Sequence, residues 1–325
     1  MAYAPPFPWF GGKSRVADLV WQRFGEVKNY VEPFFGSGAV LFLRPHEPGI
    51  ETINDLECYV ANFWRALQAA PDEVARWADW PVNEADLHAR HWWLVNQSEF
   101  REKMHSDPDH YDAKIAGWWV WGICQWIGSG WCAYPEWQQL PHLGDSGMGV
   151  HRPSQQLPHL GNPGMGVHRP SQKRPHLGNP GMGDLYAYLH GIAARLRGVR
   201  VCCGDWSRVL GPSPTIKLGT TGVFLDPPYS HEVRDTSLYA VEMSVADGVR
   251  DWAIEHGDDP LLRIALCGYE GEHEMPDTWE CVAWKSAGGY ASQASVSNEN
   301  CHNERIWFSP HCLGVMPQPV QGVLL

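Results

Sequence analysis

The chain has 325 residues, of which 44% are hydrophobic and 19% are charged, and its formal net charge is −12. This length and composition fit a globular protein that buries a real core, with one large α/β domain and room for a smaller insertion. The net charge argues against a chain that is basic throughout, although a nucleic-acid partner remains compatible with it.

Cysteine usage and the N-terminal residues indicate the cellular compartment. Nine cysteines, an odd number without a C-x-x-C pair, favour a reducing cytoplasm over a disulfide scaffold. Residues 1–6 lack the basic start and apolar centre of a signal peptide. Residues 115–133 carry no formal charge, but they include five tryptophans and four glycines, which predicts a buried segment of a soluble protein rather than a membrane span.

The first 55 residues predict a β-turn-α-β unit preceded by a helix. Apolar residues recur at helical spacing over 15–24, and Gly25 follows as a stop. A short strand over 29–33 then enters a glycine-rich turn, residues 38–43 begin a second helix, and residues 50–55 form a strand that ends in an acid. Asp55 comes nineteen residues after Gly36, where a ribose-binding acid is found in nucleotide-binding units.

The remaining elements extend this α/β pattern. Residues 59–105 have a helical pattern rich in Trp and Ala. After the tryptophan-rich stretch and a repetitive segment, we expect a helix over 185–196, strands over 199–203, 221–225 and 263–267, a helix over 245–256 and a β-hairpin arm over 304–309. The fold class is therefore α/β, with a Rossmann-like, doubly wound sheet interrupted by a mostly helical and loop-rich insertion. The predicted domains are 1–60 with 185–325 as the catalytic domain and 61–184 as the insertion.

A seventeen-residue unit rich in Gly, Pro and His occurs three times between residues 141 and 183. The three copies begin at Pro141, Pro158 and Pro175, each with Pro-His-Leu-Gly. The units are too poor in apolar residues to form a solenoid, so we interpret them as a duplicated, extended loop. Charge is also uneven along the chain: residues 140–210 hold eight Arg and Lys against three acids, as expected where one region faces a polyanion. The alternative is a solvated basic surface.

The sequence Asp226-Pro227-Pro228-Tyr229 follows the apolar strand predicted at 221–225. Two consecutive prolines end the strand and fix a rigid turn. A carboxylate and an aromatic ring are thus held at the carboxyl end of a strand, where open α/β sheets bind ligands.

Two other nucleotide-binding motifs fit poorly. In a G-x-G-x-x-G motif starting at Gly36 the last glycine position is Leu41, and in a P-loop ending at Lys13 the first glycine position is Phe7.

Taken together, these motifs resemble the Dam-like family of N6-adenine DNA methyltransferases. The likeness rests on Pro8 to Lys13, Val31 to Gly38, Gly204 to Trp206 and Asp226 to Tyr229, and it covers residues 7–62 and about 185–310. The middle matches only as an insertion at the family's target-recognition position, and the chain looks most like a phage-borne or orphan member. The resemblance implies double-stranded DNA as the partner, a monomer, no membrane, and a cytoplasmic location in a bacterium or a phage-infected host.

The resemblance also implies S-adenosylmethionine (AdoMet) as the cofactor. The glycine turn would let the backbone approach the methionine portion, Asp55 would bind the ribose, Asp205 the adenine amino group, and Trp206 would pack on the ring. The implied cofactor-binding set is Trp9, Gly12, Lys13, Glu32, Pro33, Phe34, Phe35, Gly36, Ser37, Gly38, Asp55, Asp205, Trp206 and Asp226.

The implied catalytic residues are Asp226, Pro227, Pro228 and Tyr229. The lone pair of an adenine amine is delocalised into the ring, so acceptors aimed at its N–H bonds, the Asp226 carboxylate and the Pro227 carbonyl, would free it for direct transfer. The target base would be flipped from the duplex and stacked on Tyr229.

Each of these residues also has a structural alternative. In the structural interpretation, Asp226 is only a turn residue, Asp55 is a helix cap, and Trp206 is an ordinary core residue. The tryptophans at 118, 119, 121, 126, 131 and 137 are expected in a core, and Cys202-Cys203 as strand packing. The adjacent pairs Cys301-His302 and His311-Cys312 lack metal-ligand spacing, so no metal is expected. Alternative functions are methylation of cytosine N4 or of RNA, and a DNA-binding relative without catalysis.

Overall fold

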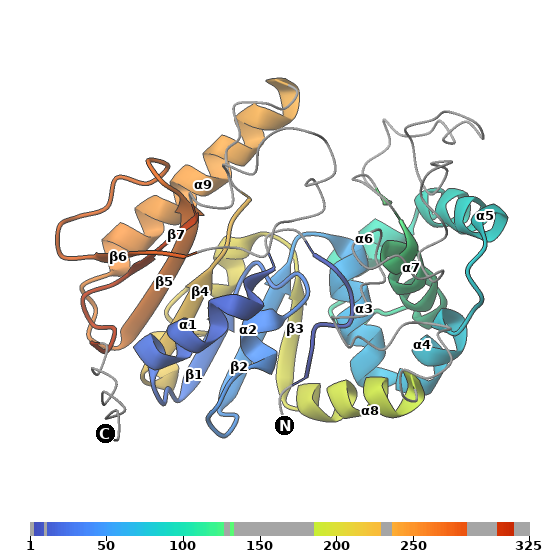
Figure 1. Cartoon of the computed structure of the whole chain (residues 1–325), viewed down its shortest axis with the longest axis horizontal. Helices are drawn as coiled ribbons and strands as arrows, with labels where there is room; N and C mark the ends of the chain where they lie inside the picture. Colours follow the sequence, from blue (N-terminus) through green and yellow to red (C-terminus); the bar gives the residue numbers. More distant parts are fainter. Residues whose placement is uncertain are drawn as a thin grey trace, which may run out of the picture.

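The computed structural model contains a seven-stranded sheet whose strand order is β3-β2-β1-β4-β5-β7-β6 (Figure 1). The structure describes residues 3–9, 12–126, 131–132, 185–228, 236–284 and 304–314. The strands are β1 (Asn29–Glu32), β2 (Ile50–Asp55), β3 (Val199–Cys203), β4 (Thr221–Leu225), β5 (Leu262–Tyr269), β6 (Glu280–Ala283) and β7 (Glu304–Phe308).

Most of the sheet is parallel, and its order reverses between β1 and β4. β1 pairs in parallel with both β2 and β4, while β3 and β5 extend the parallel part on either side. β7 runs antiparallel between β5 and β6. The mixed α/β sheet agrees with the predicted fold class and is consistent with a methyltransferase fold.

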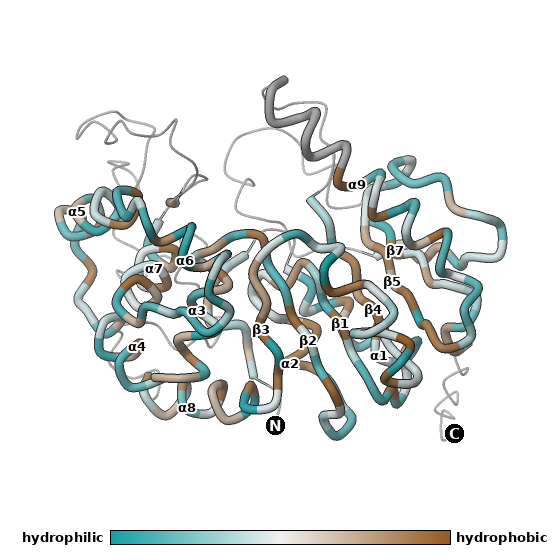
Figure 2. The backbone as a smooth tube through the Cα atoms, turned by 180° about the vertical axis from the view of Figure 1, so that it is seen from behind, coloured by the Kyte–Doolittle hydropathy of each residue, from teal (hydrophilic) through white to brown (hydrophobic). Residues whose placement is uncertain are grey.

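Successive strand residues point to two different cores. Tyr30 and Phe224 belong to one buried cluster, while their neighbours Val31 and Val223 belong to the other. Side chains alternate across a strand, so a sheet with a core on each face buries every position, and β1 and β4 are buried along their whole length. Figure 2 shows hydrophobic stretches along β4 and its neighbour β5.

Helices pack on the sheet and beside its β3 edge (Figure 1). Helix α1 (Ala17–Phe24) contributes to the cluster that holds Tyr30, and α9 (Thr236–His256) contributes Val249 and Ala253 to the other. Beyond β3 lies a group of helices: α3 (Cys58–Ala69), α4 (Pro71–Ala78), α5 (Glu84–Val95), α6 (Phe100–Ser106), α7 (Ala113–Gln125) and α8 (Leu185–Leu196). The short helix α2 (Ala39–Phe42) follows the glycine turn.

The tryptophans of α7 and the residues after it form a core, as predicted. Trp119, Trp121, Trp126 and Trp131 are buried and Trp118 is partly buried, whereas position 137 lies outside the described residues. Their N–H groups find backbone acceptors, as buried indoles require: Trp121 donates to the Trp80 carbonyl at 2.8 Å and Trp131 to the Trp119 carbonyl at 3.0 Å. None of the helices in the described part of the chain combines the length and the apolar character needed to cross a bilayer.

Several elements differ from the sequence prediction. Helix α9 begins nine residues earlier than predicted, and β5 continues through Tyr269, two residues beyond its predicted end. β6 was not predicted, because its four residues are mostly exposed and carry no apolar pattern. β7 is antiparallel as expected of a hairpin arm, but it is an inner strand rather than an edge.

The division into a catalytic domain and an insertion stays a prediction. Its first boundary, after residue 60, falls inside α3, whose residues continue without interruption from Cys58 to Ala69. The three repeats at 141–183 lie outside the described residues.

A buried charge network secures the middle of the sheet to the helices. The carboxylate of Glu51 in β2 accepts from Arg195 of α8 at 2.6 and 2.8 Å and from Arg44 at 2.9 Å. Glu51 and Arg44 are almost completely buried. Removing one member of such a network leaves uncompensated buried charge.

We therefore predict that Glu51→Ala lowers the free energy of unfolding by about 3–5 kcal/mol, measured by urea denaturation. Glu73→Ala, which removes the exposed partner of Arg76, is the control and should change stability little. Equal losses in the two variants would contradict the prediction.

Candidate active site

The carboxyl ends of four neighbouring parallel strands meet at one edge of the sheet, the upper edge in Figure 1. The glycine turn follows β1, Asp55 ends β2, Asp205 follows β3 and Asp226 follows β4. β1 pairs with β2 and β4, and β2 pairs with β3. The motifs therefore lie along the edge in the order Asp205, Asp55, glycine turn and Asp226. The strand order reverses between β1 and β4, and open α/β sheets bind ligands at such reversals.

The turn after β1 requires glycine at two positions. Gly36 has a φ of +49° and Gly38 a φ of +74°, backbone conformations that residues with side chains rarely adopt. A Cβ on Gly36 would lie 2.4 Å from Cδ1 of Trp9, and one on Gly38 would lie 2.6 Å from Cζ of Phe35. The indole of Trp64 donates to the Gly36 carbonyl at 2.9 Å. Glycine at both positions therefore lets aromatic side chains pack closely against the buried backbone of the turn.

Asp55 anchors this turn from the neighbouring strand. Its Oδ2 accepts from the Gly36 N–H at 2.9 Å, and its Oδ1 accepts from the Glu57 N–H at 2.9 Å. Burial raises the pKa of Asp55 to about 7, although both backbone hydrogen bonds lower it. Asp55 thus has a structural role, because it accepts hydrogen bonds from two backbone N–H groups as a capping residue does. A carboxylate that accepts two hydrogen bonds still has acceptor positions for a ligand.

Asn54, which sequence reasoning did not single out, ties three strand ends together. Its Nδ2 donates to the Pro33 carbonyl at 3.0 Å and to the Gly204 carbonyl at 2.9 Å, and the backbone carbonyl of Asn54 accepts from the Phe35 N–H at 3.0 Å. The side chain is 2% exposed. An asparagine next to a candidate ribose-binding acid carries no sequence signal of its own, because its partners are backbone groups far away in the chain.

The end of β3 carries Asp205 and Trp206. Asp205 is exposed, and its Oδ1 accepts from the backbone and the hydroxyl of Ser207, so that it caps a short 3-10 helix (Trp206–Val209). Trp206 is partly buried against the second core cluster, as its structural alternative predicted. Its ring also faces Phe34 of the glycine turn, with centroids 6.4 Å apart and planes inclined by 29°. The aromatic pair therefore links the ends of β1 and β3.

Asp226, at the end of β4, forms an ion pair with the N-terminal segment. The Lys13 Nζ lies 2.9 Å from Oδ1 of Asp226 and 3.9 Å from Oε2 of Glu304 in β7. Burial alone would lower the pKa of Lys13, but the negative groups around it, Asp226 first among them, hold this pKa well above its ordinary value. Lys13 is therefore a permanent cation. Its contact with Glu304 was not foreseen, because the 304–309 segment was noted only as a strand.

A second buried carboxyl, that of Glu32, lies at the end of β1. It is 3% exposed, and its Oε2 accepts from the hydroxyl of Tyr30 at 2.8 Å. Burial raises the pKa of Glu32 well above its usual range; the Tyr30 hydrogen bond opposes this effect, and the charge of Asp226 adds to it. This carboxyl therefore retains its proton to higher pH than an exposed glutamate does.

The structure brings most of the predicted site residues to the same edge. Pro33, Ser37 and Pro227 are buried there, while Gly12 and Pro228 are exposed. Tyr229 lies outside the described residues.

Part of the basic window predicted to face a polyanion serves the fold instead. Arg195 pairs with Glu51, and Arg208 donates to the Cys203 carbonyl at 3.1 Å. Arg197 and Arg200 are exposed, while Arg152, Arg169, Lys173 and Arg174 lie outside the described residues. The net excess of positive charge in this window is thus not all available to a partner.

The sheet order, the glycine turn after β1 and the Asp-Pro-Pro sequence after β4 are consistent with a methyltransferase fold. The model of the D12 class N6 adenine-specific DNA methyltransferases matches residues 9–105. The chain is also similar to the DNA N-6-adenine-methyltransferase of Escherichia phage P1, with 26% identity over 101 residues. That alignment covers 31% of this chain and only 13% of the phage protein.

These matches confirm the resemblance to adenine methyltransferases. The family match includes the glycine turn and Asp55 and continues through α3 to α6, further than the likeness noted from the sequence. It ends before β3 and β4, so the assignment of Asp205 and Asp226 depends on the geometry described above.

We predict that Asn54→Ala lowers the free energy of unfolding by about 1–3 kcal/mol, because the buried Pro33 and Gly204 carbonyls lose their donor. Urea denaturation measures the effect. Asn96→Ala, which removes an exposed hydrogen bond to the Trp92 carbonyl, is the matched control. The prediction fails if the two substitutions have the same small effect.

Proposed function

We propose that this protein transfers a methyl group from AdoMet to the N6 amine of an adenine in duplex DNA. The observation that carries the proposal is the position of Asp226-Pro227-Pro228 at the end of β4, directly beside the glycine turn at the end of β1. A cofactor bound on the turn would face an acceptor held by the Asp-Pro-Pro sequence across the switch point of the sheet.

The residues at this edge fit AdoMet. Gly36 and Gly38 place no side chain on the turn after β1, Asp55 has acceptor positions left for ribose hydroxyls, and Trp206 with Phe34 offers an aromatic surface for the adenine. When bound, AdoMet supplies an electrophilic methyl group on a positively charged sulfur.

The chain's own contribution to transfer is positioning and electrostatics. Asp226 accepts one N–H of the adenine amine and the Pro227 carbonyl accepts the other, so the nitrogen lone pair is freed from the ring. Lys13 fixes the direction of the Asp226 carboxylate through their 2.9 Å ion pair. After transfer, Asp226 is the group placed to take the proton that the nitrogen gives up.

Reaching the adenine amine requires a flipped base, because this group is paired inside a duplex. We propose that Tyr229 stacks on that base and that the region 61–184 selects the target sequence. We also propose that the protein acts as a monomer in the cytoplasm of a bacterium or a phage-infected host.

The proposal is tested with the full chain, labelled AdoMet and duplex DNA, followed by nucleoside analysis. We expect label in N6-methyladenine. Label in N4-methylcytosine or in RNA, or no transfer at all, would overturn it and favour the corresponding alternative.

Asp226→Asn should lower the transfer rate by about 10²-fold or more, because the amide both loses charge and presents a donor to the amine. AdoMet affinity, measured by calorimetry, should change much less. Asp251→Asn, which removes an exposed surface carboxylate, is the control. Equal activity of the Asp226 and Asp251 variants would show that Asp226 has no catalytic role.

AdoMet affinity should also depend on the protonation of Asp55. The pKa of this carboxyl is raised from 3.8 to about 7, so at pH 6 it is mainly protonated and accepts poorly from a ribose hydroxyl. Raising the pH from 6 to 8 should therefore tighten binding by up to about tenfold. Asp55→Asn should bind more weakly and lose this pH dependence. An identical pH profile in the variant would assign the effect to another group.

A further inference from the structure

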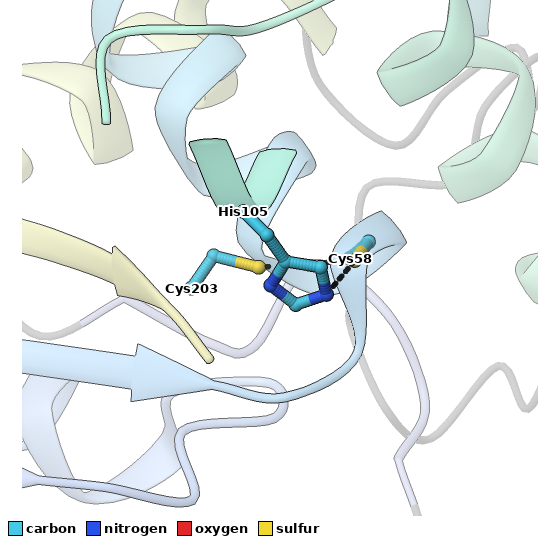
Figure 3. Close-up of side chains that lie close together, drawn as sticks. All are labelled: Cys58, His105 and Cys203. Atoms are coloured by element: carbon cyan, nitrogen blue, oxygen red, sulfur yellow. Dashed lines mark hydrogen bonds between the residues drawn. The ribbon is translucent and has the colours of Figure 1, made fainter. Parts of the chain in front are cut away.

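We propose that Cys58, His105 and Cys203 form a zinc site that fastens helix α6 to the edge of the catalytic sheet. Figure 3 shows the three side chains converging from three different elements. Cys58 is the first residue of α3, Cys203 is the last residue of β3, and His105 lies near the end of α6.

The spacing of the ligand atoms matches tetrahedral zinc. With Zn–S of about 2.3 Å and Zn–N of about 2.0–2.1 Å, neighbouring ligand atoms lie about 3.8 Å apart for two sulfurs and about 3.5 Å for sulfur and nitrogen. The Cys58 and Cys203 sulfurs are 3.8 Å apart, and the Cys58 sulfur is 3.4 Å from Nε2 of His105. All three ligand atoms lie within 4.8 Å of one another. Two edges of the tetrahedron are thus already at the expected length.

The ligand types and their exposure also favour zinc. Two thiols and an imidazole are the donors that Zn²⁺ binds in proteins, whereas Mg²⁺ and Ca²⁺ require oxygen. Both cysteines are buried and His105 is exposed, which gives the ion an entry path from solvent and leaves the fourth position to water. On binding, Zn²⁺ replaces the two thiol protons, which pass to the buffer.

The neighbouring carboxylates already have other partners. Asp55 accepts from the backbone of Gly36 and Glu57, and Glu57 accepts from the Tyr59 N–H and lies 3.4 Å from Arg101. These contacts hold the two acids in place around the cluster without using the sulfurs.

The position of the cluster gives it a structural consequence. Cys203 in β3 is paired in register with Asp55 in β2, so a metal bound at Cys203 would lie beside the strand end that carries the candidate ribose-binding acid. His105 belongs to the helices beyond β3, in the region predicted to select the target. A bound ion would therefore fix the orientation of α6 relative to the ends of β2 and β3. Metal binding here does not depend on whether the chain methylates DNA.

The test uses the full chain in a Cys281→Ser background, so that the exposed thiol of Cys281 does not contribute to the measured binding. Reduced, chelator-treated protein is titrated with Zn²⁺, and metal content is measured by mass spectrometry. Co²⁺ is then substituted to reveal thiolate-to-metal charge transfer. We expect one ion per chain, a tetrahedral Co²⁺ spectrum and a raised unfolding temperature with Zn²⁺.

Two ligand variants and two control variants locate the ion. Cys203→Ser and His105→Gln should each weaken Zn²⁺ binding by more than about tenfold; His105 is exposed, so its variant keeps the buried packing intact. Cys124→Ser removes a buried thiol that contacts the Pro6 carbonyl, and Cys312→Ser disrupts the adjacent His-Cys pair near the C-terminus; both should bind normally.

Three results would overturn the proposal. One is that Zn²⁺ fails to bind at one ion per chain. The second is binding that survives both ligand substitutions, or that is lost in Cys312→Ser. The third is formation of a Cys58–Cys203 disulfide that Zn²⁺ does not prevent, detected by peptide mapping, which would make the pair a redox site instead.

Discussion

The ion pair between Lys13 and Asp226 is the interaction on which the arrangement of the site depends. A lysine that is 5% exposed needs a compensating negative charge, and the carboxylate 2.9 Å away supplies it. The pair joins the N-terminal segment to the end of β4, while Glu304 brings β7 to the same point. Burial of one cation thereby fixes the positions of three segments that are far apart in the sequence.

The neighbouring strand ends are held by polar contacts in addition to aromatic packing. Asn54 bonds backbone groups that follow β1 and β3, and Asp55 bonds the N–H of Gly36. Trp9 and Trp64 close the glycine turn from the side of the helices. Polar contacts suit an edge that binds a ligand. A carboxylate that holds a turn can still accept hydrogen bonds from the ligand, whereas an apolar side chain in its place could not.

Much of the fold could be predicted because its signals are local. Strands β2, β3 and β4 and helix α8 have the bounds that their apolar patterns indicated, since these segments are short, buried and separated by turn residues. β6 escaped prediction because it is largely exposed and depends on β7 for its pairing. Non-local pairing of this kind leaves no periodicity in the sequence.

The candidate site divides in the same way. Asp55 and Asp226 could be proposed because each follows an apolar strand and belongs to a recognisable motif, whereas Asn54 and Glu304 act through partners that only the fold brings near. Cys58 and Cys203 are the clearest case of a contact that the sequence does not signal. They are 145 residues apart in the chain, yet their sulfur atoms lie 3.8 Å apart. Cys203 was expected to pack in a strand, and it is buried in the core as expected.

The location of that cysteine pair explains how the helices beyond β3 connect to the sheet. Helix α3 starts at Cys58, three residues after Asp55, and continues without a break into the region predicted to select DNA. Arg65 of this helix donates to the Val201 carbonyl in β3 and to the Met104 carbonyl in α6, each at 3.3 Å. One helix thus contacts the strand that ends beside the candidate cofactor residues and also the helix that carries His105. A displacement of α6 would therefore be transmitted through Arg65 to β3, the strand paired with the one that ends in Asp55, so the proposed target selection and the proposed cofactor binding would depend on the same helix.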